Sequence, residues 1–287
     1  MTKIPIRQIK SKPKEPNLVG SFNIRSIHEL LDGEDLIQEL HRHDFFYILL
    51  LKKGSGFHEI DFIEYKVCNY SIFFMRPGQV HQITLRAGST GYLMQFNSNF
   101  YYPNDKTSSQ LLQKASTKNL CQLDAQRVKK ILGILAFIFQ EDSEKQEGYL
   151  EVIKSSMSIF FIELVRHRQN KNSSLNEHSS YSQLQLEKFV DLIETHIFEY
   201  KQVSKYAEML HLSTYQLNAI TKTTLNKTAS DLINEYMILE AKRNLLATSN
   251  LVNQIADDLG HEDVSYFIRF FKKHTGYSPE AFRQNFK

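Results

Sequence analysis

The pattern of apolar and polar positions changes once along the chain, and the change predicts two kinds of architecture. Up to about residue 97, apolar residues occur in short or alternating runs between turn residues, which is typical of β-strands in a sandwich or barrel. From residue 124 onwards they recur every three or four positions, which predicts helices. The predicted strand segments are residues 45–51, 57–62, 70–75, 81–85 and 92–96.

The helical pattern is clearest near the C-terminal end. Ile255 and Leu259 mark the apolar face of a short helix, and Gly260 follows where a helix end favours a positive φ. Glu262 or Asp263 can cap a second helix, whose inward-facing positions are Val264, Phe267, Phe270 and Phe271. Two short helices joined by such a turn predict a helix-turn-helix, whose second helix can enter a DNA major groove.

A second copy of this pattern lies upstream. Residues 203–213 resemble residues 252–262 at an offset of 49, and after the turn the offset becomes 50. Asn226 then stands where Gly276 stands in the other copy, and asparagine is the residue that most readily replaces glycine at a positive φ. Between the copies, helical spacing predicts one long helix from Ala229 to Ala247. The sequence therefore predicts two helix-turn-helix units joined by a linking helix.

The linking helix and the C-terminal tail carry a family resemblance. Together with the two units, the segment Glu240–Leu246 and the tail Thr275–Arg283 resemble the DNA-binding domain of AraC-type (AraC/XylS) transcription regulators over about residues 182–286. The resemblance implies sequence-specific binding to double-stranded DNA, and RNA polymerase is a further partner that it allows. An all-helical packing module is the alternative, but it would explain the apolar spacing without explaining a duplicated turn.

The residues expected to contact DNA follow from helix-turn-helix geometry, in which outward residues of the second helix reach bases and turns contact phosphates. They are Thr214, Tyr215, Asn218 and Lys222 in the first unit and Asp263, Ser265, Arg269, Lys272 and Lys273 in the second. Asn218 suits adenine and Arg269 suits guanine, whereas the lysines suit phosphates. The resemblance implies weaker base reading by the first unit, because Ala219 stands where such regulators often carry arginine. Each residue has the alternative of a solvated helix face, and Asp263 that of a cap only.

The N-terminal strands carry a second resemblance. The segments His41–His43, Gly54–Gly56 and Pro77–His81 resemble the cupin jelly roll that AraC-type regulators use as a sensor domain. The implied fold is α+β and multidomain, with a cupin-like β-barrel before an all-α DNA-binding domain. The implied function is a transcription regulator that responds to a small-molecule effector bound in the barrel. The candidate pocket residues are Arg42, His43, Tyr47, His81 and Gln95.

Three histidines raise the question of a metal. His41 and His43 are two apart, so both point to one face of a strand, and His81 can come from a neighbouring strand. Three imidazoles suit a divalent first-row metal. Cupin metal sites, however, resemble H-x-H-x3–4-E, and Tyr47 or Ile48 stands at the position of that glutamate. We therefore expect no metal and no cofactor, and His41, His43 and His81 stay metal candidates only.

Two other functions compete with the transcription regulator. One is a metal-dependent cupin enzyme fused to a helical domain, which the missing glutamate disfavours, so we expect no enzyme activity. The other is a DNA-binding protein with a vestigial barrel that only dimerises. A closed barrel interior filled by side chains would support this second alternative.

Two long helices are predicted between the barrel and the DNA-binding domain. Asp124 can cap a helix that continues through Gln140, and a second helix runs from Tyr149 to Arg168. Their apolar stripes are wide, and the simplest interpretation is that they pack on each other and on the barrel. Because AraC-type regulators commonly dimerise through this region, the resemblance also implies a homodimer.

Domain limits follow from these elements and from the polar segments between them. Residues 107–119 are a polar connection, residues 141–148 a charged loop, and the Ser- and Asn-rich residues 169–180 a flexible linker. The expected parts are an N-terminal arm at 1–20, the cupin-like domain at 21–106, a helical dimer region at 107–170, a linker at 171–181 and the DNA-binding domain at 182–287.

Composition bears on the location of the protein and on the strength of DNA binding. Two cysteines argue against a disulfide framework, the longest apolar run, 131–139, is too short to cross a bilayer, and residues 1–17 lack a signal peptide. We therefore expect a cytoplasmic protein without membrane contact. The net charge is +3, but residues 182–287 hold 12 Lys and Arg against 13 Asp and Glu. DNA binding must then depend on the local placement of a few cations.

Overall fold

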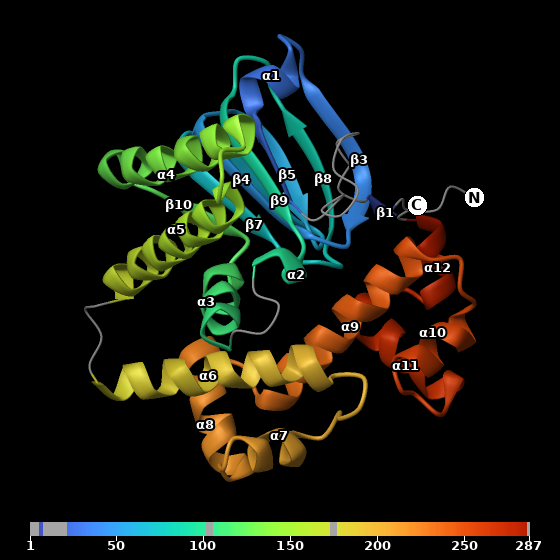
Figure 1. The fold of residues 1–287 in the computed structure, drawn as a ribbon. Helices are drawn as coiled ribbons and strands as arrows, with labels where there is room; N and C mark the ends of the chain where they lie inside the picture. Colours follow the sequence, from blue (N-terminus) through green and yellow to red (C-terminus); the bar gives the residue numbers. More distant parts are fainter. Residues whose placement is uncertain (1–5, 8–21, 102–105, 173–176, 286–287) are drawn as a thin grey trace. The chain divides into compact units, whose positions relative to one another are not determined.

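The computed structural model describes residues 6–7, 22–101, 106–172 and 177–285. It divides into an N-terminal unit within Ile4–Asn172 and a C-terminal unit that contains Ser173–Lys287. Strands occupy the first unit, and the described part of the second is helical (Figure 1). Of the predicted N-terminal arm, only β1 (Ile6–Arg7) is described, and it pairs in parallel with β3. The rest of residues 1–20 lies outside the described residues.

Two five-stranded sheets build the N-terminal unit. The first has the order β1-β3-β8-β5-β6 and the second the order β10-β7-β4-β9-β2. The bounds are β2 (Phe22–Ser26), β3 (Leu36–His43), β4 (Phe46–Lys53), β5 (Gly56–Ile60), β6 (Ile63–Val67), β7 (Ser71–Met75), β8 (Val80–Leu85), β9 (Thr90–Phe96) and β10 (Leu120–Gln122). This is the cupin-like β-domain expected from the sequence, although β2, β3, β6 and β10 were not among the predicted strand segments.

The second sheet is buried on both faces, which explains the unbroken apolar run in β4. Tyr47 and Leu49 face a core between the two sheets, whereas Ile48 and Leu50 face a core shared with helices. Successive side chains of a strand point to opposite faces. A strand that lies between two cores therefore needs apolar residues at every position, and β4 is buried from Phe46 to Leu51.

Helices cover the outer face of this second sheet. The helices of the unit are α1 (Ile27–Leu31), α2 (Ser98–Tyr101), α3 (Lys106–Ser116), α4 (Ala125–Glu144) and α5 (Tyr149–Asn172). Buried side chains of α3, α4 and α5 share one core with the sheet, and α4 and α5 lie side by side (Figure 1). Asp124 caps α4 as predicted, because its carboxylate accepts a hydrogen bond from the Arg127 N–H at 2.8 Å.

Three segments predicted to be irregular contain helix, and those predictions were wrong for the helical part of each segment. Helix α3 occupies most of residues 107–119, α4 continues to Glu144, and α5 continues to Asn172. The predicted linker is also shortened from its other end, because α6 begins at Glu177. In α3 the few buried side chains, such as Leu112 and Ala115, are spaced for one helix face, and polar residues on the other face hid that spacing.

Seven helices build the described part of the C-terminal unit. They are α6 (Glu177–His196), α7 (Val203–Met209), α8 (Thr214–Leu225), α9 (Ala229–Ala247), α10 (Val252–Asp258), α11 (Val264–Thr275) and α12 (Pro279–Asn285). Helix α9 has the predicted bounds and contacts all the others. Helices α7 and α8 lie toward one end of α9, and α10 and α11 lie toward the other (Figure 1). None of the helices in the described parts of the chain is long and apolar enough to span a bilayer.

Candidate DNA interface and ligand-binding domain

The two helix-turn-helix turns have the same backbone form. His211 between α7 and α8 has a φ of 55°, and Gly260 between α10 and α11 has a φ of 69°. The residue after each donates its N–H to an alanine carbonyl of the first helix, at 2.9 Å and 2.8 Å respectively. His211 and Gly260 also keep the sequence offset of 49. The duplicated turn expected from the sequence is therefore present in the backbone.

The second helices of the two units also match. Helices α8 and α11 are both 12 residues long and end in left-handed residues, Asn226 with a φ of 57° and Gly276 with a φ of 80°. The prediction that Asn226 replaces a glycine is confirmed. Ser213 begins α8 with a reciprocal pair of hydrogen bonds to Gln216, which satisfies amides that lack partners within the helix.

The residues expected to contact DNA lie almost entirely on the surface. Of the nine, eight are exposed, and only Asn218 is half-buried. Five of them, together with the exposed Ala219, form equivalent stripes whose members are one helical turn apart: Tyr215, Ala219 and Lys222 on α8, and Ser265, Arg269 and Lys272 on α11. Each unit therefore presents one continuous face for a groove, and the α11 face carries two cations where the α8 face carries one.

Asn218 has partners inside the protein. Its side-chain oxygen accepts a hydrogen bond from the Ala229 N–H at 3.0 Å, and its amide donates to the Thr214 carbonyl, also at 3.0 Å. The first of these bonds joins α8 to the start of α9. Base reading by Asn218 stays a prediction, but the amide already has a structural role that the sequence did not reveal.

Asp263 and Arg269 lie together at the start of α11. The Asp263 carboxylate accepts a hydrogen bond from the Ser265 N–H at 2.7 Å, so Asp263 caps the helix as predicted. A guanidinium nitrogen of Arg269 lies 3.9 Å from the other carboxylate oxygen. Both side chains are more than half exposed, so this pair can open without loss of a buried contact.

Two exposed residues on α11 were missed by the sequence prediction. Tyr266 and Ile268 are 53% and 36% exposed, although the apolar periodicity of the helix gives them no inward position. Apolar side chains on such a helix can contact the methyl group of thymine. The sequence shows large apolar residues here at positions that do not belong to the inward-facing face of the helix, and this could have predicted their exposure.

A hydrogen bond joins the segment between α6 and α7 to the second helix-turn-helix turn. Lys201, in the segment between α6 and α7, donates to the Gly260 carbonyl at 2.5 Å. The next residue, His261, is buried against the rings of Tyr266 and Phe267, with ring centroids at 5.9 Å and 5.3 Å. Burial, and then the charge of Lys201, lower the pKa of His261.

In the N-terminal unit, four buried histidines meet between the sheets. We call them the histidine cluster: His41 and His43 from β3, His58 from β5 and His81 from β8. His43 Nε2 lies 2.7 Å from His81 Nε2, and His58 Nε2 lies 2.9 Å from His81 Nδ1. One ligand nitrogen each from His41, His43 and His81 can be chosen so that all lie within 4.8 Å of one another.

His58 was given no role from the sequence, yet it is fully buried. Burial, and then the charge of His41, lower the pKa of His58 to about 3, so its imidazole is neutral at pH 7. His58 and the buried Ile60 are two positions apart on β5 and therefore point to the same face of the strand. This spacing could have predicted from the sequence that His58 faces inward.

The predicted pocket residues divide between two faces. Tyr47 and Gln95 are directly paired across β4 and β9 and face the core between the sheets with His43 and His81. Arg42 is half-buried and alternates with His41 and His43 on β3, so its side chain points to the other face of the strand. The expectation that Arg42 shares the pocket face is therefore wrong.

Side chains fill the described part of the barrel interior. Phe45, Tyr47 and Phe73 are at most 3% exposed, and the Tyr47 ring stacks on His43 at 5.5 Å between centroids. Phe73 in turn lies against His58 at 4.7 Å. An organic ligand at these residues would have to displace packed rings.

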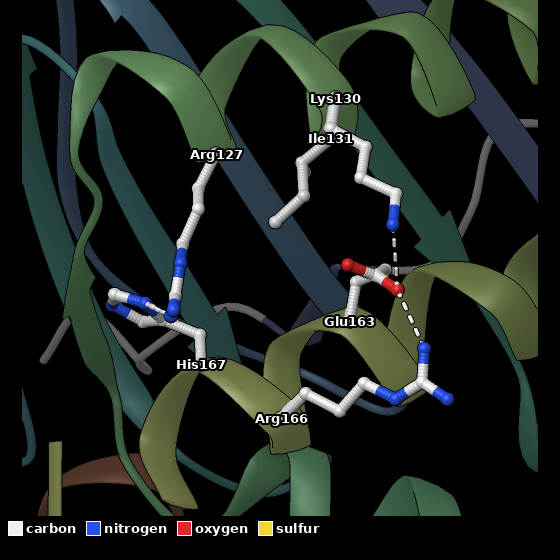
Figure 2. A pocket seen from close by; sticks show the side chains of 6 residues that line it. All are labelled: Arg127, Lys130, Ile131, Glu163, Arg166 and His167. Carbon is white, nitrogen blue, oxygen red and sulfur yellow. Dashed lines mark hydrogen bonds and ion pairs between the residues drawn. The ribbon is translucent and has the colours of Figure 1, made fainter. Parts of the chain in front are cut away.

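A small polar cavity lies between α4 and α5, outside the barrel (Figure 2). Its volume is about 170 Å³. Glu163 accepts from Lys130 at 2.9 Å and from Arg166 at 3.1 Å, and Arg127 bonds to His167. Glu163 occupies the position at which an anionic ligand would meet these cations. The charges in the cavity are therefore paired with one another, and they join the two helices.

Comparisons with known protein families match the N-terminal and C-terminal units to two different family models. Residues 33–141 match the family model described as an AraC-like ligand binding domain, and residues 206–285 match a helix-turn-helix domain. The chain is 26% identical over 257 residues to the HTH-type transcriptional activator RhaS of Pectobacterium carotovorum subsp. carotovorum (strain PC1), covering 85% of this chain and 86% of the relative.

The solved structures to which the chain is similar include a transcriptional regulator of the AraC-type DNA-binding domain-containing proteins from Chromobacterium violaceum. It is 26% identical and covers 37% of this chain and 94% of its own, with a TM-score of 0.34. Unsaturated fatty acid bound wild-type ToxT from Vibrio cholerae strain SCE256 covers 92% of this chain and 95% of its own, at 15% identity and a TM-score of 0.41.

Proposed function

Because the chain belongs to the AraC-type transcription regulators, DNA-binding proteins that carry a ligand-binding domain, we propose that α8 and α11 read two adjacent major grooves of one operator. The supporting observation is the pair of equivalent exposed stripes, Tyr215, Ala219 and Lys222 on α8 and Ser265, Arg269 and Lys272 on α11. Helix α9 separates them, and its 19 residues span about 28 Å. Successive major grooves on one side of DNA are about 34 Å apart.

The two units contribute unequally in this proposal. Arg269 and Tyr266 give α11 a donor and an apolar surface, whereas α8 presents Ala219 at the position equivalent to Arg269. Base specificity should therefore be concentrated at the half-site under α11. Thr214 and Tyr215 complete the proposed contacts of the first unit, and Asp263, Lys272 and Lys273 those of the second, whereas Asn218 is assigned to the contact between α8 and α9.

Selection of bound sequences from a random pool of DNA duplexes tests this proposal. We expect one strongly specified half-site and one weakly specified half-site, about one helical turn apart. Selection with the Arg269→Ala protein should lose the strong half-site and keep the weak one. Two equally specified half-sites, or an unchanged preference in the variant, would contradict the assignment.

The proposed effector acts through the cupin-like domain. We assign effector contact to the inward-facing His43, Tyr47, His81 and Gln95, and no longer to Arg42. The filled barrel interior specifically favours a second candidate, a regulator whose barrel takes no organic ligand and serves dimerisation. A small-molecule screen for altered operator binding distinguishes them, because hits that Tyr47→Ala abolishes support an effector site in the barrel.

Dimerisation, location and further partners belong to the same proposal. A homodimer formed through α4 and α5 is supported by three exposed apolar side chains on these helices, Phe137, Ile159 and Ile162. The DNA-binding domain begins near residue 182, and the helical region at 107–170 completes the cupin-like domain of residues 21–106. The regulator acts in the cytoplasm, contacts RNA polymerase at its promoter, and has no catalytic activity.

A further inference from the structure

The histidine cluster has an organisation that the proposed DNA contacts do not use. We propose that His41, His43 and His81 bind one divalent first-row transition metal ion, with Zn²⁺ as the reference ion. His58 and the Glu39 carbonyl act as outer partners that orient two of the three imidazoles. This goes beyond the proposed function, because the ion can bind whether or not it changes operator affinity.

The distances between the nitrogens suit a single ion. His43 Nε2 and His81 Nε2 are 2.7 Å apart, and the nitrogens of all three histidines fit within 4.8 Å. Two imidazole nitrogens bound to one tetrahedral Zn²⁺ at 2.0–2.1 Å lie about 3.3 Å from each other. Small side-chain rotations therefore convert the present arrangement, in which His43 and His81 share a proton, into one that surrounds an ion.

A backbone carbonyl fixes the tautomer of His41. Its Nδ1 lies 2.7 Å from the Glu39 oxygen, and because a carbonyl oxygen only accepts, Nδ1 carries the proton. The neutral ring then offers the lone pair of Nε2 to an ion. The register shift in β3 between Gln38 and His41 is a local irregularity of the kind that re-aims a side chain.

His58 performs the same task for His81. When His81 Nδ1–H donates to His58 Nε2 across their 2.9 Å contact, the Nε2 of His81 carries a lone pair and faces His43. Ligating histidines almost always donate their other N–H to such an outer partner, which orients the ring and strengthens the ligand. His43 joins as the third ligand with its proton on Nδ1. Ion binding thus needs a redistribution of protons between ring nitrogens and no new group.

The donor set selects the kind of ion. Three neutral imidazoles without a carboxylate favour Zn²⁺, Ni²⁺, Co²⁺ or Cu²⁺ over Mg²⁺ and Ca²⁺, which prefer oxygen ligands. The side chains are at most 4% exposed and packed rings surround them, so an ion fits without the displacement of rings that an organic molecule would require. The three ligands come from β3 and β8, and His58 from β5, which are consecutive strands of one sheet. The ion would therefore fasten this sheet.

Metal binding by the full-length protein tests the inference directly. Untagged Cys68→Ser protein removes a half-buried competing thiol and is treated with a chelator, dialysed and then titrated with ZnCl₂ or MgCl₂. We expect about one Zn²⁺ per chain by elemental analysis, and a rise in melting temperature with Zn²⁺ but not with Mg²⁺, because a ligand that binds only the folded state stabilises it.

Variants separate a built site from general affinity. His58→Gln should weaken Zn²⁺ binding by about 10- to 100-fold while the stoichiometry stays the same, and His41→Gln should abolish stoichiometric binding. His28→Gln, which removes an exposed histidine of the same unit, should behave like the parent. Circular dichroism of each metal-free protein verifies that it is folded. If His41→Gln does not fold, the milder variant His58→Gln still decides the test.

Equal Zn²⁺ binding by the parent, His41→Gln and His58→Gln proteins would overturn the inference, as would the absence of stoichiometric Zn²⁺ in the folded parent. Operator binding is measured on the same samples by fluorescence anisotropy. Protein that binds its operator but takes up no stoichiometric Zn²⁺ would leave the proposed function standing while the metal site fails. Protein that binds one Zn²⁺ per chain but does not bind its operator would leave the metal site standing while the proposed function fails.

Discussion

At the scale of single residues, the internal partners of a side chain separate structural residues from DNA-contacting ones on α8. Asn218 connects α8 to α9 through the Ala229 N–H, which belongs to a buried residue. In Asn218→Ala this N–H loses its partner, and an unsatisfied buried donor costs about 1–3 kcal/mol. Urea unfolding followed by circular dichroism should show this loss of stability, and the preferred operator should stay unchanged.

The control for Asn218 is Thr223→Ala, an exposed position on the same helix, which should change stability little. A changed base preference at normal stability in Asn218→Ala would instead make Asn218 a base reader, as its sequence position predicts.

Arg269 is the residue for which base reading gives the sharpest expectation. Arg269→Ala should cost about 1–3 kcal/mol on the selected operator and much less on unrelated DNA, because a bidentate contact to guanine carries that much discrimination. Lys273→Ala is the matched comparison on the same helix. It should weaken binding equally on all sequences and reduce the slope of log K against log salt by about 1. Competition anisotropy at several salt concentrations measures both, and an equal loss on all sequences for Arg269→Ala would make it a phosphate contact.

The sequence predicts the role of a residue when that role depends on its neighbours in the sequence. It does not predict a role that depends on neighbours brought together by the fold. The exposure of Arg269 and the cap at Asp263 follow from helical periodicity and from the turn before them. The partner of Asn218 is 11 residues away on another helix, and the contact between His58 and His81 depends on the pairing of β5 with β8. Strand parity should have excluded Arg42 from the pocket face, but the motif His41–His43 was read as a unit.

At the scale of elements, the second turn depends on its fit against the segment before α7. A Cβ on Gly260 would lie 2.4 Å from the Phe198 carbonyl oxygen, and the φ of 69° already disfavours a side chain. Gly260→Ala should therefore destabilise the C-terminal unit by more than the 1–2 kcal/mol expected from a left-handed backbone alone. Gly276→Ala gives that reference value, because its φ is 80° and its Cβ would meet nothing within 4 Å. Thermal unfolding compares them, and equal losses would show that the Phe198 contact yields.

His261 makes the stability of the same turn depend on pH. Because its pKa is lowered in the folded state, the unfolded chain binds a proton below about pH 6.5 that the folded chain does not. Stability should therefore decrease as pH falls below about 6.5, until the folded pKa is reached. His261→Gln removes this component, whereas His274→Gln, at an exposed position nearby, should retain it. Urea unfolding from about pH 7.5 to about 5.5 measures the difference, and parallel curves for the parent and His261→Gln would contradict the assignment.

The elements themselves could be predicted where one periodicity dominates. Helix α9 combines a strong apolar pattern with a capping threonine, and its bounds agree with the prediction. Helix α3 and the ends of α4, α5 and α6 were missed because polar composition was taken as evidence of loops, although polar residues are compatible with the exposed face of a helix. Strand β6 was missed because its side chains are mostly exposed, so it lacks an apolar run.

At the scale of the whole molecule, the charge of the DNA-binding domain makes a second protomer important. Residues 182–287 carry 12 Lys and Arg against 13 Asp and Glu, so one protomer brings few unopposed cations to the phosphates. Affinity per protomer should be modest and only weakly dependent on salt, because the slope of log K against log salt scales with the number of phosphates neutralised. Two linked protomers on one operator gain affinity because the second binding event becomes intramolecular.

The dimer can be tested through the exposed apolar side chains of α4 and α5. Phe137 is 45% and Ile159 is 51% exposed, and an aspartate at either position would place a charge in the apolar interface. Phe137→Asp and Ile159→Asp should each shift the protein from dimer to monomer in sedimentation at micromolar concentration and weaken operator binding. Phe57→Asp is the matched control, since Phe57 on β5 is also 51% exposed but lies outside the proposed interface. A parent protein that sediments as a monomer would contradict the proposed homodimer, and a dimer that only Phe57→Asp dissociates would move the interface away from α4 and α5.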